Sequence, residues 1–313
     1  MDKNKRKFLR KKISLFFLKI FISLCESIPL STFQRLGKFL GKIAYYFISP
    51  QRKIALESLK IAFPNLSLKE RKKITKKFFI FMVQASLEVI YFSKFPSLLE
   101  KEIEVEGEEF LKEALSKGKG VVLLTAHYGN FPLISLFLAQ KGYKINVVAR
   151  PMRDERVGEL VENLRAKAGV KTIFSYPRKE CVNGIIKALR NNEIVMIQMD
   201  QNFGTGGVWV KFFGKLAATP TGPIVISLRT KSAIVPVYIR KNESKHLVRF
   251  FPEEPLEYFS DRDEMILRNA IKFTKIIESW IKEVPYFWSW NHRRWKSRPS
   301  QKIFKIRFKV QKD

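Results

Sequence analysis

The chain has 313 residues, 46% of them apolar, which is enough for a globular protein with one large or two modest domains. Its 59 Lys and Arg residues against 29 Asp and Glu residues give a formal net charge of +30, and this predicts an anionic partner: a nucleic acid, an anionic membrane surface or an acidic carrier protein. Cys25 and Cys181 are too few and too far apart for a disulfide scaffold or a zinc site, so we expect a reduced protein that faces the cytoplasm.

The amino-terminal segment is strongly basic and then apolar. Seven of the first twelve residues are Lys or Arg, and an apolar run follows over residues 13–24. Lys19 interrupts this run, and Leu24 stands directly before Cys25 where a cleavage site prefers a small residue, so we do not expect a cleaved signal peptide. Lys19 and Glu26 also break the length of about 20 apolar residues that a bilayer span needs. For residues 13–30 we favour an interfacial anchor over a single span, with the basic end at the cytoplasmic leaflet in both cases.

A basic amphipathic helix is predicted at residues 33–47. Its apolar residues recur at helical spacing, and Arg35, Lys38 and Lys42 lie between them. Such a helix either lies on a membrane surface or packs against the core with its polar face in solvent.

Two further helices follow. The first covers residues 51–63 and ends at Pro64. The second begins at the capping-box pattern Ser67–Glu70 and continues to about residue 92. We therefore predict that residues 1–95 form a basic, helical, membrane-anchoring portion.

The pattern changes after an acidic boundary segment at residues 100–109. Short apolar runs then alternate with amphipathic segments, which predicts an α/β fold with a mostly parallel central sheet flanked by helices. Strands are predicted at 120–125, 145–149, 194–199 and 233–239, and helices at 131–141, 154–168, 180–191, 219–230 and 262–283. A long loop is expected over residues 200–216. Residues 96–313 are assigned to this α/β domain, which ends in an aromatic and basic tail at residues 288–298.

The three histidines are the candidates for a base that works near neutral pH. His127 follows the apolar run 120–125, at the sheet edge where α/β proteins bind ligands, and is either a catalytic base or a histidine simply hydrogen-bonded at a strand end. His246 lies in a polar segment before a strand and is expected at the surface. His292 lies within the tail.

Several blocks of the sequence occur in a characteristic order. They are Leu36–Gly41, Leu59–Pro64, Thr125–Pro132, Arg150–Pro151, Asp200–Gln201, Gly207–Gly214, Ala218–Pro223 and Phe287–Pro299. Together they resemble the bacterial lipid A biosynthesis acyltransferases, the lauroyl and myristoyl transferases, over nearly the whole chain.

The resemblance implies transfer of a fatty acyl group from acyl carrier protein, or from acyl-CoA, to a hydroxyl of a lipid A precursor at the inner membrane. It implies an anionic membrane and a phosphorylated glycolipid acceptor as partners, with no cofactor and no metal. In this mechanism a histidine removes the proton of the attacking hydroxyl, which contributes roughly 10²–10⁴-fold to the rate, and a carboxylate orients the imidazole.

The sequence departs from the family's His-x4-acid motif, because the acidic position holds Pro132. Proline suits the first turn of a helix but cannot polarise an imidazole. Another carboxylate serves, or His127 works without a partner at a reduced rate, or the chain is a catalytically silent, basic membrane-binding protein. We favour the first alternative with Asp200, which follows the apolar run 194–199 at the same sheet edge; its other interpretation is a turn or helix-capping aspartate.

Four further residues are candidates for binding substrate. Arg150 ends a predicted strand and suits bidentate contact with a phosphate or carboxylate, or forms a salt bridge. Asn130 either donates to a developing oxyanion or caps the next helix. Thr219 and Thr221 either face a head group or cap a helix.

The tail contains more indoles than a free surface accommodates. We expect it to be partly packed, with Arg293, Arg294, Lys296 and Arg298 available to anionic head groups. A nucleic-acid partner is disfavoured, because the basic residues are scattered through amphipathic helices and no nucleic-acid-binding motif is present.

Overall fold

The computed structural model describes residues 27–204, 206–242, 245–304, 306 and 309–311, together with residues 16, 20, 22 and 23. The basic amino-terminal segment and most of residues 13–30, on which the anchoring prediction falls, lie outside this part. Among the described residues, no helix is both long and apolar enough to cross a membrane.

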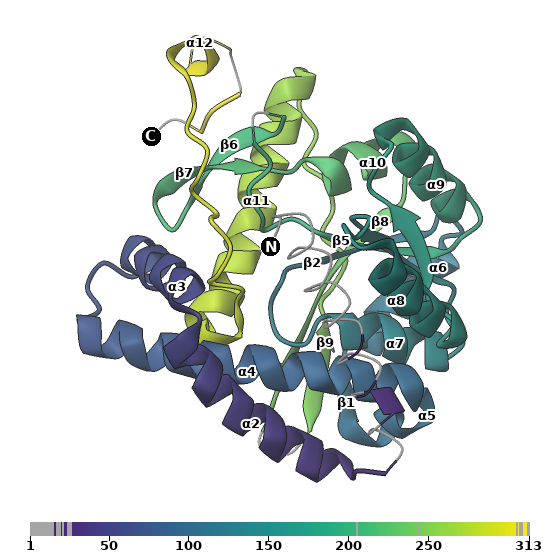
Figure 1. Ribbon diagram of the computed structural model, residues 1–313. Coiled ribbons are helices and arrows are strands. Elements are labelled where there is room, and N and C mark those ends of the chain that lie inside the picture. Colours follow the sequence, from purple (N-terminus) through teal and green to yellow (C-terminus); the bar gives the residue numbers. More distant parts are fainter. Residues whose placement is uncertain are drawn as a thin grey trace.

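Within the described part of the chain, a seven-stranded sheet with the order β1-β9-β8-β2-β5-β3-β4 forms the centre (Figure 1). Its strands are β1 (Ile103–Glu106), β2 (Val121–Thr125), β3 (Ile145–Ala149), β4 (Lys171–Phe174), β5 (Ile194–Gln198), β8 (Ala233–Lys241) and β9 (His246–Phe250). The neighbours from β8 to β4 are parallel, whereas β9 is antiparallel to β8 and parallel to β1. Every residue of β2 is buried, as its uninterrupted apolar run predicts for a central parallel strand.

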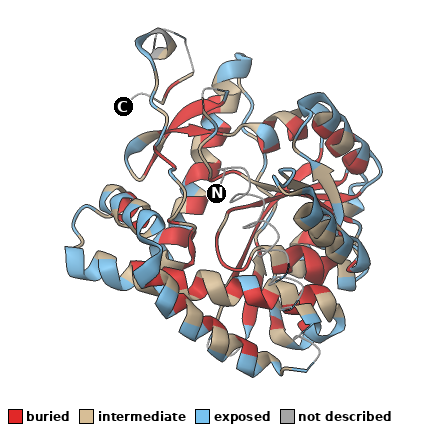
Figure 2. Cartoon of the chain, viewed as in Figure 1, coloured by how far each residue is buried: buried red, intermediate tan, exposed pale blue. Residues whose placement is uncertain are grey.

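Helices cover both faces of the sheet. Successive strand residues point to opposite sides, and in β2 the residues on both sides are buried, so each face needs a covering layer. Leu123 packs with α6 (Glu108–Ser116) and α7 (Pro132–Gln140) on one side. Leu124 packs on the other side, in a cluster that includes residues of α9, α10 and α11. These three helices are α9 (Arg178–Arg190), α10 (Gly222–Thr230) and α11 (Arg262–Glu283). A further helix, α8 (Glu155–Lys167), contacts β4. Figure 2 shows the buried central strands and the exposed outer faces of the helices.

Three helices precede the sheet: α2 (Leu30–Phe47), α3 (Ser49–Ala62) and α4 (Leu68–Lys94). The capping box that opens α4 is present, since Glu70 and Ser67 exchange side-chain-to-backbone hydrogen bonds. Glycine lets α2 approach α4 closely, because a Cβ at Gly41 would lie 2.5 Å from the Cα of Ile80. Residues of α4 belong to the apolar clusters on both sides of the sheet, so the amino-terminal helices pack directly on the α/β portion.

The predicted α/β architecture is confirmed, and the predicted strands and helices correspond to β2, β3, β5, β8 and to α7–α11. Other elements were not predicted. The acidic segment 100–109 forms η1 (Glu100–Glu102), β1 and the start of α6, and the expected loop 200–216 contains β6 (Val208–Phe212) and the start of β7 (Lys215–Thr219). Phe213 and Gly214 join this hairpin with φ of 50° and 74°, as a tight two-residue turn requires. The remaining short elements are α5 (Pro96–Leu99), η2 (Pro285–Phe287) and α12 (Gln301–Phe304).

Candidate active site

His127 and Asp200 are brought together by the register of two neighbouring parallel strands. Thr125, the last residue of β2, lies opposite Gln198, the last residue of β5. His127 and Asp200 each follow two residues later, so both lie at the carboxyl edge of the sheet, where α/β folds place their ligands.

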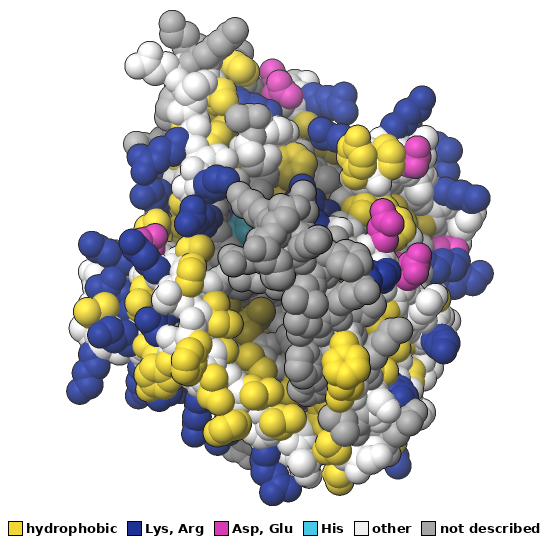
Figure 3. Space-filling model, in the orientation of Figure 1, with side chains coloured by type: hydrophobic (Ala, Val, Ile, Leu, Met, Phe, Trp, Pro, Cys, Tyr) yellow, Lys and Arg dark blue, Asp and Glu magenta, His cyan; other side chains and the backbone are white. Residues whose placement is uncertain are grey.

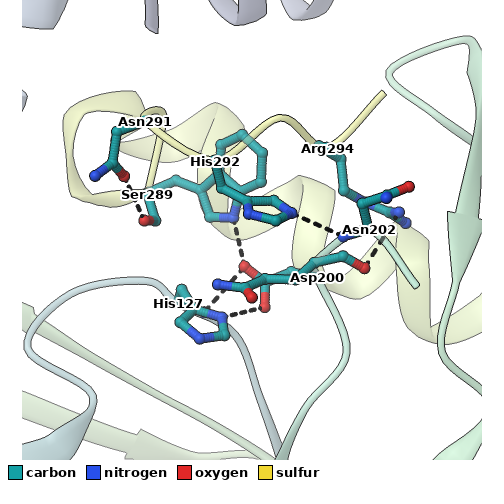
Figure 4. Close-up of polar contacts among 9 residues, drawn as sticks. His127, Asp200, Asn202, Ser289, Asn291, His292 and Arg294 are labelled. Carbon is teal, nitrogen blue, oxygen red and sulfur yellow. Dashed lines mark hydrogen bonds and ion pairs between the residues drawn. The ribbon is translucent and has the colours of Figure 1, made fainter. Parts of the chain in front are cut away.

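The carboxylate of Asp200 accepts hydrogen bonds from three directions (Figure 4). Its Oδ1 lies 2.8 Å from Nδ1 of His127, and its Oδ2 accepts from the His127 backbone N–H at 3.0 Å and from Nε1–H of Trp288 at 2.7 Å. The side chain of Asp200 is 1% exposed, while that of His127 is 26% exposed. Burial alone would raise the pKa of Asp200, but the His127 and Trp288 contacts hold this pKa below its ordinary value, so the carboxylate is charged at neutral pH.

This arrangement selects one tautomer of His127. A charged carboxylate can only accept, so the proton of the neutral ring resides on Nδ1. The lone pair is then on Nε2, to which no side chain of the described residues bonds. His127 can therefore take a proton from a hydroxyl group that reaches the exposed edge of its ring.

The turn that follows His127 depends on a glycine and on the tail. Gly129 has φ of +60°, and a Cβ there would lie 1.6 Å from the carbonyl oxygen of Ile239. Its N–H donates to the Phe287 carbonyl at 3.0 Å, and the Ser289 N–H donates to the His127 carbonyl at 3.1 Å. The chain leading into the tail thus holds the turn by its backbone.

The tail is packed rather than exposed over much of its length, as predicted: Trp288, Trp290 and Trp295 are buried. The expectation that Arg294 is available to head groups is wrong, because this side chain is 1% exposed. Its guanidinium donates to the Ala218 carbonyl and, at 2.7 Å, to Oγ1 of Thr219. Burial lowers the pKa of Arg294 to about 10, with Asp200 acting in the opposite direction.

Asn130 is buried on the other side of the His127 turn. Its amide donates to the Ala85 carbonyl at 3.2 Å and to Oε2 of Glu88 at 3.1 Å, so both amide hydrogens are engaged with α4. No side-chain hydrogen bond caps α7. Asn130 therefore connects α4 to the turn that holds His127.

Glu88 is the centre of a buried ionic cluster. Its carboxylate contacts Nζ of Lys241 at 2.7 Å and Nε2 of His246 at 3.1 Å, and it accepts from Gln34 at 3.0 Å. Burial alone would raise the pKa of Glu88, but His246 and Lys241 lower it to about 2. The expectation that His246 lies at the surface is wrong: it is 2% exposed, because β9 pairs it with Lys241 beside α4.

Comparison with known proteins shows the family of the chain. Residues 1–297 match the sequence profile of the family described as bacterial lipid A biosynthesis acyltransferase. The chain belongs to this family. The lipid A biosynthesis lauroyltransferase of Escherichia coli (strain K12) is 26% identical over 281 residues, which cover 88% of this chain and 89% of that protein. The palmitoleoyltransferase of the same strain is 27% identical over 271 residues, 84% and 85% of the two chains.

A shorter match is to an acyltransferase with a different name. The phosphatidylinositol mannoside acyltransferase of Mycobacterium tuberculosis (strain ATCC 25618 / H37Rv) is 27% identical over 135 residues, 43% of each chain. These relatives confirm the family resemblance, and the protein is an acyltransferase.

The other predicted residues of this acyltransferase lie at different distances from the surface. Arg150 follows β3 at the carboxyl edge and is exposed, as is Arg293 in the tail. Thr221 is half-buried at the N-cap position of α10 but makes no capping bond there. Thr219, predicted to begin that helix, instead ends β7, where it is fully buried and bonded to Arg294.

Two residues of the site were not predicted, although the sequence contains a signal for each. Trp288 is one of several indoles in the tail, and a buried indole N–H usually finds an acceptor, here Asp200. Glu88 is the one charged residue within the mostly apolar stretch 78–92, and a buried carboxylate requires partners.

Proposed function

We propose that the acyltransferase moves a fatty acyl group from acyl carrier protein, or from acyl-CoA, to a hydroxyl of a lipid A precursor or related glycolipid at the cytoplasmic face of the inner membrane. His127 is the general base and Asp200 is the carboxylate that orients it. One observation supports this assignment most directly: a buried, charged Asp200 accepts from Nδ1 of His127 and leaves Nε2 open.

The proposed reaction has two steps. Nε2 of His127 removes the hydroxyl proton while the acceptor oxygen attacks the thioester carbonyl and forms the C–O bond. The tetrahedral intermediate then breaks its C–S bond, and the thiolate takes the proton from the imidazolium. Asp200 stabilises the imidazolium between these steps and keeps its own negative charge.

Asp200 supplies from β5 the carboxylate that Pro132 does not supply. Pro132 is the first residue of α7, where its missing N–H costs no hydrogen bond. The acidic group then approaches the imidazole from the neighbouring strand instead of from the following helix.

The proposed attachment to the membrane is peripheral or monotopic. Phe39, Tyr46 and Phe47 of α2 are 60%, 60% and 82% exposed, and Lys38 and Lys42 beside them are exposed as well. Figure 3 shows hydrophobic side chains gathered over the lower part of one face, with Lys and Arg side chains at its periphery. Apolar side chains with a basic surround are the pattern of a surface that inserts into an anionic leaflet.

The acceptor and donor are proposed from charge. Arg150 and Arg293 are exposed and suit the phosphates of a glycolipid. The net charge of +30 suits an acidic carrier protein as donor.

A transfer assay tests the proposal. The purified protein is incubated with acyl carrier protein bearing a radiolabelled chain and with lipid A precursor, and labelled lipid is counted. His127→Ala and Asp200→Asn are each expected to lower the rate by about 10²–10⁴-fold, because each removes part of the general base. Asp263→Asn, the same change at an exposed position of α11, serves as the control and is expected to retain the wild-type rate.

The outcomes separate the alternatives. An unimpaired Asp200→Asn variant would reject the pairing of Asp200 with His127 but leave the reaction intact. If the wild type transfers the labelled acyl chain to no lipid acceptor, the result would support the alternative that the protein is catalytically silent and binds membranes.

A further inference from the structure

His292 lies close to the proposed base but has no role in the reaction described so far. Figure 4 shows its ring on the tail side of Asp200, with His127 on the other side. His292 interacts electrostatically with both His127 and Asp200. Its backbone is held in place, since its N–H donates to the Ser289 carbonyl at 3.3 Å and its carbonyl accepts from the Arg294 N–H at 3.0 Å.

One hydrogen bond determines where the His292 proton resides. The backbone N–H of Asn202 lies 2.9 Å from Nε2 of His292. A backbone N–H can only donate, so Nε2 must present its lone pair, and the neutral ring must have its proton on Nδ1. Burial lowers the pKa of His292, and the opposing effect of Asp200 does not reverse this, which agrees with a neutral ring.

The proton on Nδ1 has no acceptor within the described part of the protein. No described residue bonds to this atom, and it is not among the buried polar atoms that lack a partner, so it is open to a ligand. The two histidines flank Asp200 and have opposite patterns of donor and acceptor (Figure 4). His127 has its Nδ1 engaged by Asp200 and presents a lone pair, while His292 has its Nε2 engaged by Asn202 and presents an N–H.

We propose that His292 is a second catalytic histidine, whose Nδ1–H donates a hydrogen bond to the carbonyl oxygen of the acyl thioester. This role rests on the proposed function. As the acceptor oxygen attacks, the π electrons of the carbonyl move to its oxygen, and the oxyanion accepts the Nδ1–H bond. When the C–S bond breaks, the carbonyl re-forms, and His292 keeps its proton throughout.

Other nearby donors are already engaged. Both amide hydrogens of Asn130, the residue predicted from the sequence for this task, are bonded to α4. The terminal nitrogens of Arg294 are bonded to the Ala218 carbonyl and to Thr219. The open N–H of His292 has no such competitor.

Two substitutions separate this role from a structural one. His292→Phe keeps a ring but removes the donor, and we expect kcat to fall by about 10²–10³-fold, the usual effect of removing one oxyanion donor, with the KM of the acyl donor little changed. His292→Asn retains an amide N–H near the position of Nδ1, and we expect it to recover most of the lost kcat. Ser300→Ala, exposed beyond the tail, is the matched control and should behave as wild type.

An NMR measurement tests the proton's location without reference to activity. In protein labelled with ¹⁵N-histidine, the His292 resonances are identified by their loss in His292→Asn. We expect the Nδ1–H tautomer at neutral pH, with the pKa of His292 below that of a free imidazole. A neutral ring protonated on Nε2, or a ring whose pKa is raised, overturns the assignment.

The outcomes also separate this inference from the proposed function. An active wild type with an unimpaired His292→Phe variant overturns the role of His292 alone, as does equal loss of kcat in the Phe and Asn variants. An inactive wild type overturns the proposed function and, with it, this role.

Discussion

At the scale of single residues, the chemistry of the site depends on which polar atoms already form hydrogen bonds within the protein and which remain open to a substrate. Asp200 is buried and accepts hydrogen bonds from three donors, two of which belong to His127. A buried, charged carboxylate that loses its hydrogen-bond partner strongly destabilises the folded protein. The geometry of the pair therefore depends on the turn that presents His127.

Gly129 is the residue on which that turn depends. In Gly129→Ala the Cβ would collide with the Ile239 carbonyl, so the turn must move. We expect a loss of more than about 1 kcal/mol in the free energy of unfolding and, because a shift of about 1 Å at the base can cost 10²-fold, a loss of transfer activity of that order. Urea unfolding and the transfer assay measure the two effects.

Gly118→Ala is the matched control. Gly118 has φ of +68°, close to that of Gly129, but a Cβ there meets nothing within 4 Å. It should show only the cost of backbone strain and keep its activity. Equal activity in the two variants would mean that the collision does not displace His127.

At the scale of secondary-structure elements, α4 is the helix that connects the amino-terminal helices to the sheet. Its residues contribute to the apolar clusters on both sides, and Glu88 links it to β8, to β9 and to the turn after His127. The Glu88 carboxylate thus joins the amino-terminal helices to the turn that presents His127.

The pH dependence of stability tests this link. The pKa of Glu88 is about 2 in the folded protein, below its ordinary value of 4.5, so its contribution is fully present above about pH 4.5 and is lost as the pH falls toward 2. The size of this contribution is about 3 kcal/mol. We expect the difference in unfolding free energy between wild type and Glu88→Gln to be largest at neutral pH and to shrink as urea titrations are repeated below about pH 4.5.

Glu104→Gln is the control, since Glu104 is exposed on β1. Its difference from wild type should vary little over the same range. A difference for Glu88→Gln that does not depend on pH would mean that the carboxylate is not charged in the folded protein.

Much of this architecture could be predicted, for identifiable reasons. β2 and β5 each begin with four consecutive apolar residues, so they are recognisable as central strands, and the parallel pairing then places His127 beside Asp200. β1 and β9 have polar residues among their apolar ones, because they lie toward the edge of the sheet, and local pattern does not identify them. The contacts of Glu88 and Trp288 join segments far apart in sequence, so only the fold shows them.

At the scale of the whole molecule, charge and exposed apolar surface occur together. The net charge of +30 attracts the protein to anionic surfaces, and the exposed side chains of α2 provide apolar area to insert. Attraction of this kind is screened by salt, whereas insertion of aromatic side chains is not.

Vesicle sedimentation measures both contributions. We expect the protein to bind vesicles that contain phosphatidylglycerol more tightly than vesicles of phosphatidylcholine alone, and added salt to reduce this preference. In the double variant Phe39→Ser and Phe47→Ser, binding should fall by about tenfold or more at any salt concentration, because two apolar side chains no longer insert. Tyr258→Ser, at a position 67% exposed outside α2, should bind as the wild type does. Equal binding by the double variant would show that α2 does not face the lipid.

The dependence of Asp200 on Trp288 bears on how the enzyme is made. A nascent chain that has left the ribosome through α10 already contains His127 and Asp200, but the indole that bonds to Asp200 is 88 residues further along the chain. The backbone that supports the His127 turn, at Phe287 and Ser289, is synthesised equally late. The surroundings of the acid–base pair are therefore complete only in a chain that includes residues 287–289, and we expect a protein truncated before Phe287 to lack the proposed transfer activity.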